Sequence, residues 1–543
     1  MAFLRRVCWF SYEYKITGLF LILFVLLLHP APGIAQLSQP ARFELDKETG
    51  DHAFTLVSLK DNGISMIRQK QKSEGNKMFW EIVLLDTALQ QTWTTQLALD
   101  SRLTLVGYEY VPGELFFLFR QGESNTSDLH LIRIYLLSHA IQEFHISPKL
   151  DFRLTHFIVV GGSAVMGGYT TRQSTVLLFE MESSHLKVIP GFFIDNTELL
   201  ELKGNRNKTF NILLMERGAR EKKLLLLKTF DESGSLLLED DIEIDAGKVV
   251  QSGTTSTLGN DELFLAGTWG LGVGKQSVGF YSVLVDPFKK QPVHYYDFGE
   301  LDHFFDYVGL KRAEKIKKKA EERRKAKRFP NYQADVHIVK MEENEKGFLL
   351  LSELYVPATN TNYAPFYNYS PYYANSPYYY SPYGYNPMMM NRYFNSPYYN
   401  SPNATYNQNA DVTVIHSSLI IFDQQGKLKQ DFGFAIDGVK LLAMDQVSDF
   451  FASEKIIQFY KKEKEIYSST SWEDGNAPEQ DTLKIQLKSG QDVVRDESDD
   501  QGGVRYWYGP YAYVWGYETI KNKGEQSGDR VRYVYYVNKI KLE

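Results

Sequence analysis

The chain has 543 residues, and 43% of them are hydrophobic, which is enough for a large buried core and too many for a disordered protein. Aromatic residues reach 14%, a level that favours β-structure, and a net charge of −7 implies no polyelectrolyte partner for the chain as a whole. The single cysteine, Cys8, excludes a disulfide scaffold, a cysteine zinc site and an iron–sulfur cluster.

Residues 1–35 have the pattern of a secretory signal peptide. Basic residues precede the apolar run Ile16–Leu28, and Gly33 and Ala35 are small residues at positions −3 and −1 of a cleavage site. The run is shorter than the roughly 17–20 residues that span a bilayer, so cleavage after Ala35 is favoured over a retained anchor, and no membrane span is expected afterwards. Because the cleaved chain would hold no cysteine, we expect export in a bacterium, to the periplasm, the outer membrane or the exterior.

A unit of four strands recurs beyond residue 50. Two short apolar strands precede a hairpin of alternating apolar and polar residues, over about 45–55 residues in all. Copies of the hairpin are Trp80–Leu97, Leu131–Ile146, Val176–Phe192, Leu224–Ile244, Phe280–Phe298 and Leu419–Ile436. In strand order and repeat length, though in no family motif, the chain resembles β-propeller proteins.

The length available to the repeat favours eight blades. Without the signal and two insertions, about 434 residues remain, which gives about 54 per blade for eight blades and about 62 for seven. The C-terminus supplies three strands, so residues 41–46 are expected to be the fourth and to close the ring. The predicted fold is all-β, a propeller of eight (alternatively seven) four-stranded blades with one charged helical and one disordered insertion. Two packed β-sandwiches are the structural alternative.

The expected organisation follows the chain in order. It comprises a signal peptide (1–35), blades one to five (36–300), a basic helical insertion (301–330), the first part of blade six (331–356), a low-complexity insertion (357–410) and the remaining blades (411–543).

The first insertion is strongly basic. Apolar residues at helical spacing in Leu301–Leu310 continue into Lys311–Arg328, whose net charge of +8 leaves −17 on the chain outside this segment and the signal. Three interpretations stay open: a solvated helical linker, docking on the acidic body, or contact with a polyanion such as anionic lipid, lipopolysaccharide, acidic glycan or nucleic acid. The candidate polyanion contacts are Lys311, Arg312, Lys315, Lys317, Lys318, Lys319, Arg323, Arg324, Lys325, Lys327 and Arg328.

The second insertion, Pro357–Ala410, holds 14 tyrosines and repeats the pair Ser-Pro. Frequent proline prevents regular structure, so the segment is expected to be extended or disordered. It is either a loop without a dedicated role or an adhesive arm, since tyrosine combines aromatic area with a polar group. The candidate aromatic contacts are Tyr372, Tyr373, Tyr378, Tyr379, Tyr398 and Tyr399.

Both insertions are expected on one face of the ring. The chain reverses at every strand of a blade, so the connection between blades and the connection between a blade's second and third strands leave by the same face. A long loop at Lys461–Asp481, between the second and third strands of blade seven, is expected to join them. We predict that this is the interaction face.

Catalytic, cofactor and metal residues are not predicted. The run Gly270–Lys275 departs from a phosphate-binding loop, Asp496–Gly502 departs from a calcium loop, and the histidines form no metal-spaced helical pair. Glu300, Asp302 and Asp306 are weak candidates for a carboxylate pair. The aromatic cluster Tyr506–Tyr517 is interpreted as packing of the last blade, with sugar stacking as the alternative.

These features favour an exported, non-catalytic scaffold whose partner is an envelope protein or glycan. A carbohydrate-active enzyme, a glycoside hydrolase or lyase with carboxylates in the central funnel, is the first alternative, and a binder of anionic surfaces through the basic segment is the second. A specific nucleic acid is not expected as a partner.

Overall fold

The structure is a computed structural model of the chain. It describes residues 37–48, 50–122, 128–170, 173–191, 197–216, 223–258, 262–272, 276–286, 288–289, 291–357, 380–381, 384–385, 412–441, 445–474, 476–489, 492–522 and 530–543.

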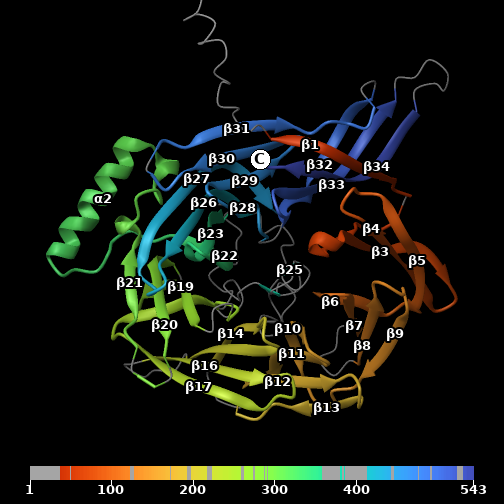
Figure 1. The fold of residues 1–543 in the computed structure, drawn as a ribbon, viewed down its shortest axis with the longest axis horizontal. Helices are drawn as coiled ribbons and strands as arrows, with labels where there is room; N and C mark the ends of the chain where they lie inside the picture. The colour runs from red at the N-terminus through yellow and green to blue at the C-terminus, as the bar shows by residue number, and fades with distance from the viewer. Residues whose placement is uncertain are drawn as a thin grey trace, which may run out of the picture.

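Eight antiparallel four-stranded sheets form a ring, in which β6, β10 and β14 are the innermost strands of their sheets (Figure 1). The first four blades are β2 (Thr55–Ser58), β3 (Ile64–Glu74), β4 (Lys77–Leu85) and β5 (Gln91–Asp100); β6 (Leu103–Val111), β7 (Glu114–Gln121), β8 (Leu129–Tyr135) and β9 (Ile141–Ile146); β10 (Arg153–Val160), β11 (Ser163–Thr170), β12 (Gln173–Glu180) and β13 (His185–Val188); and β14 (Thr197–Gly204), β15 (Thr209–Glu216), β16 (Lys223–Asp231) and β17 (Leu236–Ile244).

The ring continues with four further blades. They are β18 (Lys248–Thr255), β19 (Leu263–Leu271), β20 (Ser277–Val285) and β21 (His294–Asp297); β22 (Asp335–Asn344), β23 (Gly347–Pro357), β26 (Val412–Phe422) and β27 (Leu428–Leu441); β28 (Ser448–Ala452), β29 (Ile456–Lys462), β30 (Glu465–Ser471) and β31 (Glu479–Lys484); and β32 (Val493–Tyr508), β33 (Tyr511–Asn522), β34 (Arg530–Lys541) and β1 (Ser38–Asp46).

The last blade takes its outer strand from the other end of the chain. β1 runs antiparallel to β34, with Arg42 opposite Asn538 and Asp46 opposite Val534. This pairing covers the edge of β34 and closes the ring, because an uncovered strand would leave a row of unpaired backbone groups. The predicted fold class is confirmed: the protein is an eight-bladed β-propeller.

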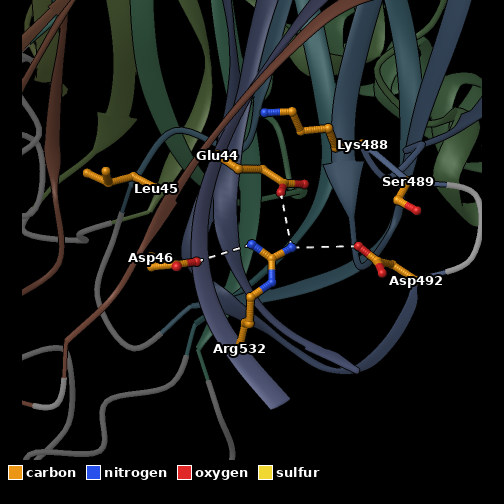
Figure 2. Close-up of a pocket in the computed structure, with 7 residues that line it drawn as sticks. All are labelled: Glu44, Leu45, Asp46, Lys488, Ser489, Asp492 and Arg532. Carbon is orange, nitrogen blue, oxygen red and sulfur yellow. Dashed lines mark hydrogen bonds and ion pairs between the residues drawn. The ribbon is translucent and has the colours of Figure 1, made fainter. Parts of the chain in front are cut away.

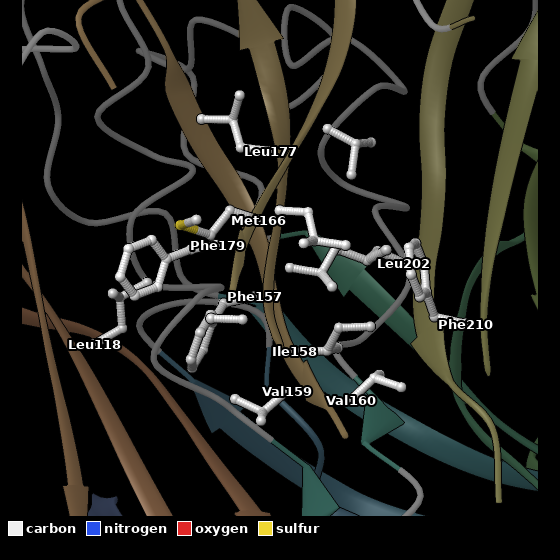
Figure 3. Packing of buried hydrophobic residues seen from close by; sticks show 14 of the residues in the cluster. Leu118, Phe157, Ile158, Val159, Val160, Met166, Leu177, Phe179, Leu202 and Phe210 are labelled. Carbon is white, nitrogen blue, oxygen red and sulfur yellow. The ribbon is translucent and has the colours of Figure 1, made fainter. Parts of the chain in front are cut away.

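The core lies between adjacent blades. Figure 3 shows Leu118 of β7, Phe157 of β10 and Phe210 of β15 in one cluster, so both faces of the third blade are covered by its neighbours. Strands buried on both faces read as continuous apolar runs instead of alternating ones. β11 follows this rule, because seven of its eight residues are buried.

Five inner strands share an irregularity. The pairing of the first with the second strand shifts by one residue in blades two to six, at Val106, Thr155, Leu200, Gln251 and Val339. Such a β-bulge increases the local twist and redirects the side chains that follow it. The side chains after the bulge therefore point to the opposite face of the sheet from the one that strict alternation along the sequence predicts.

The basic insertion contains the α-helix of the described residues, α2 (Leu310–Lys325). It starts later than the spacing in Leu301–Leu310 predicts. One short 3-10 turn, η3 (Asp306–Val308), lies in that region, another, η2 (Phe298–Glu300), comes just before it, and Gly309 at φ 81° separates η3 from the helix. A third turn, η1 (Lys60–Asn62), follows β2. Among the described helices, none is long and apolar enough to span a membrane.

The strand order makes the connections that carry the two insertions leave the ring at the same face. α2 connects β21 to β22, and Pro357–Ala410 connects β23 to β26, the second and third strands of blade six. Within the second insertion the structure describes a short pair, β24 (Tyr380–Ser381) and β25 (Gly384–Tyr385). The prediction of a long loop at Lys461–Asp481 is wrong, because β29 and β30 are joined there by a tight turn and β30 itself lies inside this range.

Candidate functional site

Helix α2 lies on the outside of the ring (Figure 1). It packs against the ring through a narrow stripe of small side chains. Ala313 and Ala320 are buried, and Ile316 is half-buried against a cluster that includes Phe304. A spacing of three, four and seven residues puts these positions on one helix face. Contact at Ala320 is close, because a Cβ added at Gly299 of η2 would lie 2.3 Å from the Ala320 Cβ.

Charged groups fix the same face of α2 to the body. Arg324 donates to Asp297 at 2.7 Å and lies 3.9 Å from Glu300, and Lys317 donates to the main-chain carbonyl of Asp302. Asp297 also caps η2 by accepting from the Gly299 N–H at 2.8 Å, while Glu300 accepts from the Asp297 N–H at 2.9 Å. Burial raises the pKa of Glu300. The helix is therefore held in a defined orientation.

The segment following Glu300 is anchored to blade six. Asp431 of β27 accepts from the backbone N–H groups of Asp302 (2.7 Å) and His303 (2.8 Å). Burial raises the pKa of Asp431. The side chain of Asp306 bonds His303 Nδ1 at 2.9 Å, and this contact raises the pKa of His303. The weak carboxylate candidates Glu300 and Asp306 thus serve as local structural contacts, and the backbone of Asp302 serves in the same way.

Eight of the eleven predicted cations are exposed. The other three, Lys317, Arg323 and Arg324, are half-buried, and Arg323 donates to the carbonyl of Phe329 at 2.7 Å. The exposed cations are Lys311, Arg312, Lys315, Lys318, Lys319, Lys325, Lys327 and Arg328. Against them stand three exposed glutamates, Glu314, Glu321 and Glu322, so the outward surface has a local excess of five positive charges.

A row of lysines runs along the solvent side of α2. Lys311, Lys315, Lys318 and Lys325 follow one another at intervals of four, three and seven residues, which places them on one face, opposite Ala313. We call these four residues the lysine stripe. They extend over about 21 Å of helix axis. Within the stripe, Lys325 pairs with Glu321 on the same helix at 2.6 Å.

The six tyrosines predicted as aromatic contacts lie outside the described residues. The structure places the two ends of their segment at β23 and β26. Their role as contacts remains a prediction.

A second group of polar residues lies between neighbouring blades. Glu353 of β23 is fully buried, and its carboxylate accepts from the N–H of Val447 (3.0 Å) and from both the N–H (2.6 Å) and the hydroxyl (2.7 Å) of Ser448. Burial raises the pKa of Glu353 to about 7. This carboxylate joins blade six to blade seven.

Buried carboxylates also accept hydrogen bonds from the next blade at other blade junctions. Glu201, on the strand after a bulge, accepts from the N–H (2.8 Å) and hydroxyl (2.6 Å) of Thr255 in the next blade. Asp449 of blade seven accepts from the Tyr506 N–H of blade eight at 2.8 Å and pairs with Lys340 at 2.6 Å. Buried carboxylates of this kind need such partners. They satisfy backbone donors across blade boundaries.

The aromatic cluster at Tyr506–Tyr517 contributes to packing between the last and first blades. Trp507 is fully buried, and its Nε1–H donates to the carbonyl of Gly63 at 3.1 Å. Tyr517 accepts from the N–H of Phe54 at 2.7 Å. Tyr513 stacks on Trp515, with ring centroids 5.4 Å apart. These contacts match the packing interpretation of the cluster.

A polar pocket of about 590 Å³ lies beside the closing strand. Figure 2 shows Arg532 between Glu44, Asp46 and Asp492, at 3.6, 3.3 and 3.6 Å. Leu45, Lys488 and Ser489 complete the lining. Because Arg532 is surrounded by carboxylates that belong to β1 and to the connection into β32, the pocket belongs to the ring closure. Among the described residues, no group of three or more His, Cys, Asp or Glu side chains could hold a metal ion.

The junction carboxylates and the Arg532 pocket were not found from the sequence. Glu353 and Ser448 are 95 residues apart, and Arg532 and Glu44 come from opposite ends of the chain. One signal was present, because Glu353 is the single carboxylate inside β23, a strand that is otherwise largely apolar. A lone charge in such a strand indicates a buried partner in the fold.

Comparisons with known proteins give likeness in fold only. Neither a family model nor a curated protein matches the chain. Similar solved structures include the polysaccharide lyase Uly1 (8% identity, 81% of this chain and 90% of that chain covered, TM-score 0.36). They also include the β-propeller domain of the Trilobed protease from Pyrococcus furiosus (9%, 79% and 98%, 0.33) and prolyl oligopeptidase B from Galerina marginata (8%, 90% and 56%, 0.38). Nothing about the chemistry of this chain follows from them.

Proposed function

We propose that the protein is an exported, non-catalytic β-propeller that acts as a binding scaffold in the bacterial envelope, with α2 as its contact to an anionic surface. The observation that carries the proposal is the lysine stripe. In the structure Ala320 and Arg324 anchor the helix to the body, and Lys311, Lys315 and Lys318 are exposed. Export rests on the signal pattern of residues 1–35.

The junction carboxylates support a scaffold over an enzyme. A general acid or nucleophile has to reach the substrate. Glu201, Glu353 and Asp449 instead accept hydrogen bonds from the backbone of the next blade. Sustained cleavage of an acidic or neutral polysaccharide by the purified protein, abolished by Glu353→Gln in a folded variant, would contradict the non-catalytic role.

Cell fractionation tests the contact role of α2. The stripe variant carries Lys311→Gln, Lys315→Gln and Lys318→Gln, since glutamine keeps helix propensity and removes charge. The control variant carries the same change at three exposed lysines elsewhere, Lys77, Lys484 and Lys541.

We expect the wild type and the control variant in the envelope fraction and the stripe variant largely in the soluble fraction. Circular dichroism establishes that all three chains are folded. Equal distribution of the stripe variant and the wild type would contradict the proposed contact.

A further inference from the structure

We infer that the anionic surface is a phospholipid bilayer, and that Leu310 and Phe329 enter its interfacial layer at the two ends of the basic segment. This inference rests on the proposed function and specifies the partner of the same helix. It joins two observations on the basic segment: a row of exposed lysines and two exposed large apolar side chains.

The apolar side chains are the first observation. Leu310, the first residue of α2, is 81% exposed, and Phe329, four residues after the helix ends, is 51% exposed. Each is next to exposed cations, Leu310 to Lys311 and Phe329 to Arg328. Exposed apolar groups beside a basic cluster are typical of a surface that binds lipid.

Charge complementarity is the second observation. Each lysine near an anionic lipid surface strengthens binding about fivefold. The stripe is long enough to meet several headgroups, and α2 lies at the outside of the ring, where a flat surface can approach it (Figure 1). A nucleic acid or an acidic glycan would satisfy the lysines but would offer no apolar layer for Leu310 and Phe329. An anionic bilayer offers headgroups for the lysines and an apolar layer for Leu310 and Phe329.

The helix needs no ordering on binding. Arg324 is fixed by Asp297, and Arg323 donates to the carbonyl of Phe329, which defines the turn that carries this ring. A preorganised surface avoids the entropic cost of folding on contact. The lysines and the two apolar side chains can therefore contact the membrane without any prior folding of the helix.

Vesicle sedimentation separates lipid from other polyanions. The probes are vesicles of phosphatidylglycerol and phosphatidylethanolamine, vesicles of phosphatidylcholine, and soluble polyphosphate. The apolar variant is Leu310→Ser with Phe329→Ser. Its control is Leu137→Ser with Phe288→Ser, which changes the same residue types at positions that are 97% and 93% exposed elsewhere on the protein.

The wild type should bind the anionic vesicles and not the phosphatidylcholine vesicles. The apolar variant should bind the anionic vesicles about tenfold more weakly and bind polyphosphate unchanged, while its control behaves as the wild type. Equal vesicle binding by the apolar variant, or wild-type binding to polyphosphate alone, would overturn the lipid inference and leave the proposed function standing. If the stripe variant bound the anionic vesicles and polyphosphate with wild-type affinity, both the lipid inference and the proposed function would be overturned.

Discussion

The carboxylate of Glu353 in blade six accepts two hydrogen bonds from Ser448, the first residue of β28 in blade seven, at 2.6 Å from its N–H and 2.7 Å from its hydroxyl. Glu353 is fully buried, and the hydroxyl oxygen of Ser448 lies 2.9 Å from that of Ser417, from which it can accept. The bond satisfies a backbone N–H that the next blade would otherwise leave unpaired. The junction between two blades is thus specified by a polar contact inside an apolar core.

Stability should depend on pH through Glu353. Its pKa is about 7 in the folded protein, against an ordinary value of 4.5 that applies to the unfolded chain, so the folded state binds the proton more tightly. Protonated Glu353 contributes up to about 3 kcal/mol to the free energy of unfolding. This contribution is fully present below pH 4.5 and is lost as the pH rises through 7. Glu353→Gln should remove this dependence.

Urea denaturation between about pH 4.5 and 7.5 measures the effect as the difference between wild type and variant. Glu345→Gln, on an exposed glutamate of the turn before β23, is the matched control and should follow the wild type. If the difference in unfolding free energy between the wild type and Glu353→Gln stayed constant over this pH range, Glu353 would not titrate as described.

Gly63 should tolerate no side chain. Its φ is 112°, and an added Cβ would lie 1.9 Å from the carbonyl oxygen of Leu85. Gly63→Ala should therefore cost more than about 2 kcal/mol of unfolding free energy. Gly75→Ala is the control, because Gly75 also has positive φ, at 59°, but open space around it. It should cost about 1 kcal/mol. Equal losses in thermal or urea unfolding would contradict the steric explanation.

The closing strand should depend on a buried ion pair. Arg42 of β1 donates to Glu518 of β33 at 2.7 Å, and their side chains are 5% and 1% exposed. Glu518→Met leaves the Arg42 charge buried near Glu44 alone and should destabilise the protein by about 3 kcal/mol. Arg42→Met with Glu518→Met should cost less than the sum of the two single changes. A double-mutant cycle measures the coupling energy, and a value near zero would mean that the pair does not hold β1.

Helix α2 should loosen without unfolding the ring when its close contact is filled. Gly299→Ala would place a Cβ 2.3 Å from that of Ala320, so the helix must move outward. We expect the amides of α2 to exchange with deuterium at least about tenfold faster, while those of the inner strands are unchanged. Adding Ala320→Gly restores the space and should restore slow exchange. Unchanged exchange in the single variant would refute the tight packing of α2.

The repeat allowed the fold to be predicted because its signals are local. Apolar strands and polar turns recur along the chain, and the count of three C-terminal strands required a fourth, which β1 supplies. The basic segment was visible for the same reason, since its charge is contiguous in sequence.

Other features depend on contacts between distant residues or on single backbone angles. The spacing in Leu301–Leu310 indicates a helix, yet the 3-10 turn η3 forms there, and the positive φ of Gly309 separates it from α2. The bulge at Leu200 directs Glu201 toward Thr255 of the next blade, and no spacing in the sequence reveals that partner. Lys461–Asp481 is polar, and polarity alone did not distinguish the strand β30 from a loop.

The salt dependence of binding tests the central claim most directly. The affinity of the wild type for phosphatidylglycerol vesicles should fall steeply, by about tenfold or more, between low and physiological ionic strength, because the exposed lysines of α2 are screened. The stripe variant should bind weakly with a shallow salt dependence, and the Lys77, Lys484 and Lys541 control should follow the wild type. The same steep dependence in the stripe variant and in the wild type would contradict α2 as the anionic contact.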